Sequence, residues 1–204
     1  RGYRKIPLAA PMQETLAAAL ILATGWQGRT PFVNPMCGSG TLAIEAALIA
    51  LNRAPGLGRN NYGFMYIKDF PHELWQAMRK KARMASKKTL PSKILATDID
   101  ATAVQAANQN AKTAGVDLLI EFVTCSFEET SIPGGGGIII MNPPYGERME
   151  PLKIKMLRPD RRKEIAPGQK VILRKAADMV HKSNHPNALQ RLEALYESCG
   201  NWFK

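Results

Sequence analysis

The stretch Gly137-Ile138-Ile139-Ile140-Met141-Asn142-Pro143-Pro144-Tyr145-Gly146 decides what fold this sequence can adopt. Its four consecutive apolar residues predict a short strand buried on both faces, as in the middle of a parallel sheet. The strand ends at once in a stiff turn, because both prolines fix φ and the first holds Asn142 out of the helical region. A rigid polar turn directly after a buried strand indicates a site rather than an ordinary connection.

The turn at residues 142–145 is suited to one kind of ligand. The side-chain oxygen of Asn142 and the carbonyl between Pro143 and Pro144 can both accept hydrogen bonds from one planar NH₂ group. The ring of Tyr145 can stack on the molecule that carries this group. An exocyclic amine of a nucleobase fits the description, and such an arrangement would suit transfer of a methyl group to it.

Strands and helices alternate through most of the chain, which predicts βαβ units. We expect strands at 31–34, 93–98, 118–125 and 138–141, and helices at 11–26, 42–51, 72–88 and 101–114. Residues 52–70 are expected to form a loop. The fold class is therefore α/β, a doubly wound Rossmann-like sheet with right-handed crossovers and helices on both faces.

The pattern is less regular after Arg148. Residues 150–186 are basic, contain four prolines and show no clear strand, whereas 188–204 have the spacing of an amphipathic helix. We expect residues 150–190 to be a basic insertion, either an arm that contacts RNA or a disordered loop. Four strands followed by a helix also predict a sheet that is incomplete at its C-terminus.

A glycine-containing turn follows the first predicted strand and leads directly into a helix. It contains Cys37, Gly38, Ser39, Gly40 and Thr41. Unpaired N–H groups at the start of a helix can meet a ligand here, and glycine lets the backbone come close. The spacing differs from both the dinucleotide fingerprint and the P-loop. Its position at the first strand-to-helix crossing nevertheless favours a binding loop.

Two acids end the second predicted strand. Asp98 is placed to accept hydrogen bonds from both ribose hydroxyls of an adenosyl ligand. Asp100 is expected to cap the helix at 101–114 instead, because aspartate is favoured at the N-cap.

Charge and composition indicate the kind of binding partner and the cellular location. The net charge is +11 and the pI is near 9.8, and the excess is clustered: residues 79–93 hold seven basic side chains and no acid. Clustered cations favour a polyanion such as RNA, although many basic helix faces are only solvated. The three cysteines and three histidines lack the spacing of a metal site, so we expect no metal. Widely separated cysteines and the lack of a long apolar run predict a cytoplasmic protein without a membrane span.

Three segments together resemble a known family. They are 32–47 (Phe-Val-Asn-Pro-Met-Cys-Gly-Ser-Gly-Thr-Leu-Ala-Ile-Glu-Ala-Ala), 97–108 and 142–148. The likeness is to S-adenosylmethionine-dependent methyltransferases often called N6-adenine-specific DNA methylases. Their better-understood members are large-subunit ribosomal RNA guanine-N2 methyltransferases, in which a THUMP domain precedes the catalytic domain. The resemblance covers residues 1–148 and resumes at 191–204, and residues 1–10 resemble the joint between the two domains.

This resemblance implies roles at the matching positions. The loop from Cys37 to Gly40 would enclose the methionine end of the cofactor S-adenosyl-L-methionine, with Thr41 also in the cofactor site. Asp98 would hold the ribose of the cofactor, and Ile99 would pack on its adenine. Asn142 and Pro143 would accept hydrogen bonds from the target amine, and Tyr145 would stack on a flipped-out base. Such a mechanism depends on positioning and needs no general base of unusual pKa.

Two positions depart from the family pattern. Relatives usually carry an acid where this chain has Asn34 and Ser126. The resemblance places the first near the cofactor's ammonium and the second near the adenine amine. Because a hydrogen bond to a charged group contributes about 1.5–3 kcal/mol, neutral residues at both sites could weaken cofactor binding.

We therefore interpret residues 1–204 as a methyltransferase domain acting on an exocyclic amine in ribosomal RNA, with guanine N2 of the large-subunit RNA favoured. The nearest alternative is adenine N6 methylation in RNA or DNA, since the same turn serves either amine. A DNA enzyme would usually carry a target-recognition region, and none is visible. A third reading is an RNA-binding remnant with impaired cofactor binding. The sequence leaves the oligomeric state open.

Overall fold

The protein has a parallel five-stranded sheet with strand order β3-β2-β1-β4-β5. The computed structural model describes residues 2–6, 12–134 and 136–143, and the backbone of 170–173. The strands are β1 (Phe32–Asn34), β2 (Ile94–Asp98), β3 (Ile120–Thr124), β4 (Ile138–Met141) and β5 (Lys170–Leu173). The order reverses on the two sides of β1, as in Rossmann-like sheets, which confirms the predicted α/β class with a Rossmann-like parallel sheet.

Four α-helices accompany the described strands. They are α1 (Glu14–Ala23), α2 (Thr41–Ala50), α3 (His72–Met84) and α4 (Ala101–Ala114). Short 3-10 helices also occur: η1 (Pro55–Gly58), η2 (Gly63–Tyr66), η3 (Asp117–Leu119) and η4 (Phe127–Glu129). Helix α4 begins at the N-cap Asp100, whose carboxylate accepts from Thr102 N at 2.8 Å, and ends at Gly115 with φ of 67°. Both of these boundaries were expected from the sequence.

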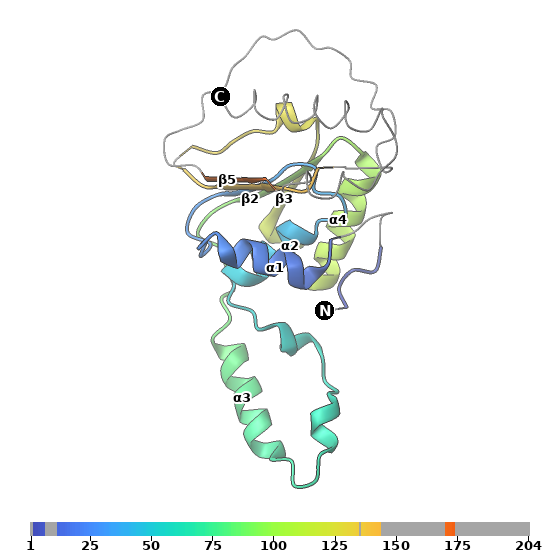
Figure 1. Ribbon diagram of the computed structural model, residues 1–204, viewed down its shortest axis with the longest axis vertical. Coiled ribbons are helices and arrows are strands. Elements are labelled where there is room, and N and C mark those ends of the chain that lie inside the picture. Colours follow the sequence, from blue (N-terminus) through green and yellow to red (C-terminus); the bar gives the residue numbers. More distant parts are fainter. Residues whose placement is uncertain (1, 7–11, 135, 144–169, 174–204) are drawn as a thin grey trace, which may run out of the picture.

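The two faces of the sheet are covered differently. Helices α1, α2 and α4 lie on one face (Figure 1), and Phe32, Ile94 and Ile138 point into the core beneath them. All residues of α2 except Ile49 are buried, because this helix lies between the sheet and its neighbours. On the other face, the strand residues form a smaller apolar cluster with loop side chains of the described chain. Its members are Val33, Leu95, Ile139 and Met141, packed against Met36, Phe127 and Ile132.

Two predictions about local structure were wrong. The loop at 52–70 contains the 3-10 helices η1 and η2. The region 150–186 contains a strand, β5, which pairs in parallel with β4 over its whole length. The signal for β5 is only three apolar residues, Val171-Ile172-Leu173, between cations. The helix predicted at 188–204 lies outside the described residues.

Residues 52–86, which we call the arm, project away from the sheet (Figure 1). The arm consists of η1, η2 and α3, and none of these helices has a buried residue. Its two ends are joined where Lys87 N donates to Leu51 O at 2.7 Å and Asn52 Nδ2 donates to Ala85 O at 3.2 Å. The arm is therefore a long excursion between α2 and β2. Within the described residues, no helix has the length and apolar character needed to cross a membrane.

The position of Phe32 in the core generates a stability prediction. Its side chain is fully buried on β1 and its ring lies 5.0 Å from that of Trp26. We expect Phe32→Ala to lower the free energy of unfolding by about 3–5 kcal/mol, measured by urea denaturation. The control is Leu118→Ala, because Leu118 is 94% exposed and should change stability by less than about 0.5 kcal/mol. Equal losses would contradict the described core.

Candidate functional site

Three polar side chains meet at the carboxyl edge of the sheet. Asn34 ends β1, Asp98 ends β2, and Asn142 directly follows β4. Strand β1 lies between the other two, at the point where the strand order reverses. Open α/β sheets bind ligands in the crevice at this point. The structure thus brings together the residues that the sequence placed in three separate motifs.

Asp98 fixes the glycine loop against β2. Its Oδ2 accepts from Gly38 N at 2.8 Å and its Oδ1 accepts from Asp100 N at 3.0 Å. The loop is held a second time because Cys37 N donates to Thr97 O at 2.9 Å. An ionised carboxylate has about four acceptor sites, so Asp98 keeps capacity for ligand hydroxyls after these two bonds.

The loop itself is packed closely against α4. Gly38 and Gly40 have positive φ, 54° and 79°, which favours glycine. A Cβ on Gly40 would lie 2.8 Å from the Cβ of Ala107, whereas one on Gly38 would have open space around it. The side chains of Ser39 and Thr41 are buried, and their hydroxyl oxygens lie 3.4 Å apart.

Cys37 is also buried, and its thiol is unreactive. Burial raises the pKa of its thiol far above the ordinary value, and the negative charge of Asp98 raises it further. The thiol therefore stays neutral, and Cys37 does not act as a nucleophile near neutral pH.

Two amide oxygens at this edge have no hydrogen-bond donor among the described residues. Asn34 is fully buried, and its Nδ2 donates to Ile140 O at 2.9 Å and to Pro35 O at 3.3 Å. Its Oδ1 and the Oδ1 of Asn142 are buried without a partner. Leaving a buried acceptor unsatisfied costs about 1–3 kcal/mol, so each oxygen is a place where a ligand donor would be stabilising.

Ile99 and Ser126 border the site from two other elements. Ile99 follows β2, and its side chain is 63% exposed. Ser126 precedes η4, and its backbone N donates to Glu129 Oε2 at 3.3 Å. Glu129 therefore brings a carboxylate beside Ser126. The Ser-x-x-Glu spacing of a capping box was the sequence signal for this missed residue.

The N-terminal segment reaches the glycine loop through Asn110 of α4. This fully buried side chain accepts from Lys5 N at 2.9 Å and Ile6 N at 3.1 Å, and donates to Ile6 O at 3.1 Å and Ser39 O at 3.2 Å. Sequence reasoning missed Asn110, since its partners in the N-terminal segment are about a hundred residues away.

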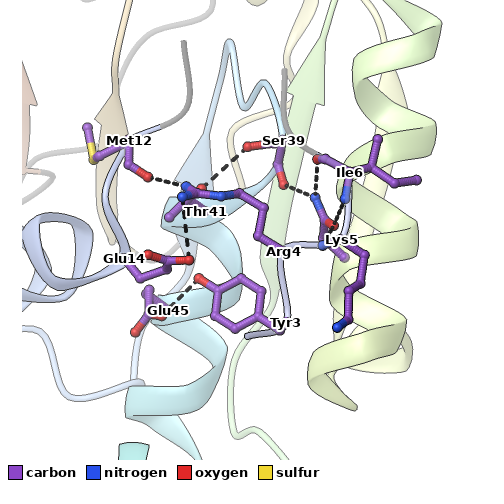
Figure 2. A network of polar contacts seen from close by, with 10 residues as sticks. Tyr3, Arg4, Lys5, Ile6, Met12, Glu14, Ser39, Thr41 and Glu45 are labelled. Carbon is purple, nitrogen blue, oxygen red and sulfur yellow. Dashed lines mark hydrogen bonds and ion pairs between the residues drawn. The ribbon is translucent and has the colours of Figure 1, made fainter. Parts of the chain in front are cut away.

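The same segment is held to α1 and α2 (Figure 2). Tyr3 donates from its hydroxyl to Glu45 Oε1 at 2.9 Å, and Arg4 donates to Met12 O at 2.7 Å and lies 3.6 Å from the carboxylate of Glu14. These contacts, together with those of Asn110, fix residues 3–6 beside the glycine loop.

Among the predicted catalytic residues, Asn142 is half-buried and Pro143 is buried. Pro144 and Tyr145 lie outside the described residues. No group of three or more potential metal ligands occurs in the described parts of the chain.

Comparison with known proteins agrees with this geometry. The family model described as "RMKL-like, methyltransferase domain" matches residues 1–157, which include every residue of the site. The chain belongs to this family. Two relatives named "Ribosomal RNA large subunit methyltransferase K/L", from Vibrio campbellii and Vibrio cholerae, are 43% and 45% identical over 154 residues. These matches cover 73% of this chain but only 22% of each relative, so the chain spans about a fifth of their length.

Solved structures of proteins with similar sequences have the same fold as this chain. SMU.472, described as a candidate methyltransferase and solved in complex with SAH, is 35% identical with a TM-score of 0.66, over 73% of this chain and 38% of that one. A methylase candidate from Clostridium difficile 630 is 43% identical with a TM-score of 0.65, over 72% and 38%. A predicted N6-adenine-specific DNA methylase from Listeria monocytogenes is 40% identical with a TM-score of 0.65, over 72% and 39%.

The close approach of Gly40 to α4 predicts a difference between two glycines. Both Gly38→Ala and Gly40→Ala place a side chain at positive φ, but only the second meets Ala107. We expect Gly40→Ala to destabilise the protein by about 1–3 kcal/mol more than Gly38→Ala, because packed backbone must shift. Thermal or urea unfolding measures the difference. Equal stabilities of the two variants would contradict the described packing of the loop.

The contacts of Asn110 predict that the N-terminal segment depends on one side chain. We expect Asn110→Ala to speed trypsin cleavage after Arg4 and Lys5, because it removes all four hydrogen bonds made by that amide. Asn61→Ala, which changes an exposed residue of the arm, is the matched control. Unchanged cleavage in Asn110→Ala would show that Tyr3 and Arg4 hold the segment alone.

Proposed function

We propose that this chain transfers a methyl group from S-adenosyl-L-methionine to an exocyclic amine of a base in ribosomal RNA, with guanine N2 in the large-subunit RNA as the favoured target. The observation that supports it most is the pair of buried, unsatisfied amide oxygens on Asn34 and Asn142. They lie at the ends of two neighbouring strands beside the switch point, so one can serve the methyl donor and the other the acceptor.

The residues on the β1 and β2 side fit the donor. Asp98 retains acceptor capacity for two ribose hydroxyls, and the exposed Ile99 offers an apolar surface to an adenine ring. Asn34 Oδ1 can accept from an ammonium group. When bound, S-adenosyl-L-methionine would supply the electrophilic methyl group. The complex of SMU.472 with SAH, at 35% identity, supports this assignment of the site.

The residues that follow β4 fit the acceptor. Asn142 Oδ1 and the carbonyl of Pro143 would each accept one hydrogen of an amine, which turns the nitrogen lone pair toward the methyl donor. Both acceptors are neutral, so their contribution is orientation rather than proton abstraction. Methyl transfer would release S-adenosyl-L-homocysteine and leave the nitrogen cationic, and its excess proton would then pass to water rather than to either amide oxygen. Tyr145 is proposed to stack on the base and hold it outside the RNA helix.

RNA as the substrate is supported by charge and by the relatives. The net charge of +11 favours a polyanion, and the Vibrio relatives are named for ribosomal RNA. We further propose that residues 1–204 act as a methyltransferase domain, with 1–10 as a joint to an RNA-binding domain. The contacts of residues 3–6 with α4 and the glycine loop are consistent with such a joint.

Adenine N6 is the second candidate target. The Listeria relative is described as an N6-adenine-specific DNA methylase, and Asn142 and Pro143 could accept hydrogens from either amine. The choice between the bases depends on groups that recognise the rest of the ring. Nucleoside mass spectrometry of ribosomal RNA methylated by the chain separates N2-methylguanosine from N6-methyladenosine.

Calorimetric titration with S-adenosyl-L-methionine tests the donor site directly. We expect measurable binding, since Asp98 and Asn34 offer hydrogen-bond acceptors and Ile99 offers an apolar surface to the cofactor. A chain that folds but binds no cofactor would contradict the enzyme and favour an RNA-binding remnant.

The proposed role of Asn142 predicts that its substitution lowers methyl transfer but leaves cofactor binding nearly unchanged. We expect Asn142→Ala to lower methyl transfer at least ~10²-fold, because a misplaced amine no longer presents its lone pair, while cofactor affinity changes little. Radiolabelled methyl incorporation and calorimetry measure the two quantities, and Asn61→Ala is the control. Retention of most of the activity in Asn142→Ala would show that this residue does not hold the amine.

A further inference from the structure

The arm has no established role, and it does not contribute to the core of the sheet. It nevertheless has ordered packing of its own. The rings of Tyr62, Phe64, Phe70 and Trp75 pack together with centroid separations of 5.0–5.6 Å. Arg79 fastens α3 to the opposite side of the arm by hydrogen bonds to Leu57 O at 3.3 Å and Asn60 Oδ1 at 2.9 Å. A small aromatic cluster and one inward-facing arginine therefore give α3 a fixed orientation.

The seven cations of residues 79–93 fall into two groups. Arg79 is used inside the arm, and Lys93 pairs with Glu121 at 3.8 Å. The others are exposed and form no ion pair with any described residue. They are Lys80, Lys81, Arg83, Lys87 and Lys88.

The charges of this region are also unevenly distributed. Lys80, Lys81 and Arg83 lie on the part of α3 near the body, and Lys87 and Lys88 follow the arm where the chain returns to β2. The two acids of the arm, Asp69 and Glu73, lie around the start of α3, where Lys68 is also exposed. Cations in the last turn favour the helix C-terminus, which accounts for Lys81 and Arg83 but not for Lys87 and Lys88 beyond it.

The base of the arm lies at the amino edge of the sheet. Helix α2 runs back from the carboxyl edge and ends there, and Ser92 Oγ donates to Arg29 O at 2.7 Å just before β1. A strand of β2's length spans roughly 17 Å at about 3.3 Å per residue, so the cations are well separated from Asn142.

We propose that the basic half of the arm binds the phosphate backbone of the substrate RNA, several nucleotides away from the base that is methylated. This inference rests on the proposed function for the identity of the polyanion. Phosphate contacts fix the register of an RNA without reading its sequence, which suits long lysine side chains on a helix of fixed orientation. Because the arm is remote from the chemistry, it contributes to RNA affinity and leaves the rate of transfer on bound RNA unchanged.

A matched pair of double variants tests the proposal. Lys80→Gln/Arg83→Gln removes two cations three residues apart on one side of α3, and Arg29→Gln/Lys112→Gln removes the same two residue types, both exposed, from outside the arm. Binding of a fluorescent large-subunit ribosomal RNA fragment to the full chain is measured by polarisation over a salt series. Circular dichroism and thermal unfolding verify that the substitutions leave the fold intact.

The expected result is specific to the arm. At ~0.1 M salt the arm variant should bind roughly tenfold more weakly, and its log–log salt slope should be smaller by about 1.4–1.8, that is 0.7–0.9 for each lost phosphate contact. KM for the RNA should rise by a similar factor with kcat unchanged, and a minimal oligonucleotide should be methylated as by the parent chain. The control variant should show little change in any of these.

Two outcomes would overturn the proposal: equal losses in both variants, or no loss in the arm variant. Equal losses would assign RNA binding to the overall charge of the protein, and no loss would make a protein partner for the exposed Leu74 and Met78 the better assignment. Failure of the proposed function is distinguishable, because it would appear as a parent chain that methylates no RNA even though RNA affinity still depends on Lys80 and Arg83.

Discussion

The site depends on one hydrogen bond, from Asn34 Nδ2 to Ile140 O. Main-chain pairing between β1 and β4 covers Phe32–Ile138 and Val33–Ile139 and then stops. Beyond these pairs, the side chain of Asn34 rather than the main chain supplies the next hydrogen bond to β4. Because a carboxylate cannot donate a hydrogen bond, the amide at position 34 holds β4 in a way that an ionised aspartate could not. The amide of Asn34 thus joins β1 to β4 beside Asn142.

The glycine loop is likewise held by groups that act in more than one way. Asp98 binds it to β2, Gly40 packs against Ala107 of α4, and Asn110 connects it to the N-terminal segment. Asp98 also retains free acceptor sites, and Asn110 also satisfies the backbone of residues 5 and 6. The loop is therefore preorganised for a ligand, which reduces the entropic cost of binding.

Much of the fold follows from local patterns in the sequence. The apolar runs at β2 and β4, the cap at Asp100 and the stop at Gly115 all identify themselves by residues within a few positions. The parallel strands then bring Asn34, Asp98 and Asn142 to one edge by topology alone. Strand β5 was missed because its apolar core is short and lies among cations that usually indicate a surface.

Other features depend on contacts between distant residues. Asn110 looks like any polar residue of an amphipathic helix until the N-terminal segment is placed against it. In the sequence, Arg79 belongs to a basic cluster. In the fold its guanidinium donates hydrogen bonds within the arm, so the sequence alone overestimates the number of cations that a polyanion can contact.

The closed base of the arm has an evolutionary consequence. Since Leu51 and Lys87 are joined by a direct hydrogen bond, the chain between them could be shortened, lengthened or exchanged without moving α2 or β2. The aromatic cluster keeps its own packing independent of the sheet. Selection can therefore act on the arm separately from the site at the carboxyl edge of the sheet. One sheet scaffold can then serve different macromolecular partners through changes in the arm alone.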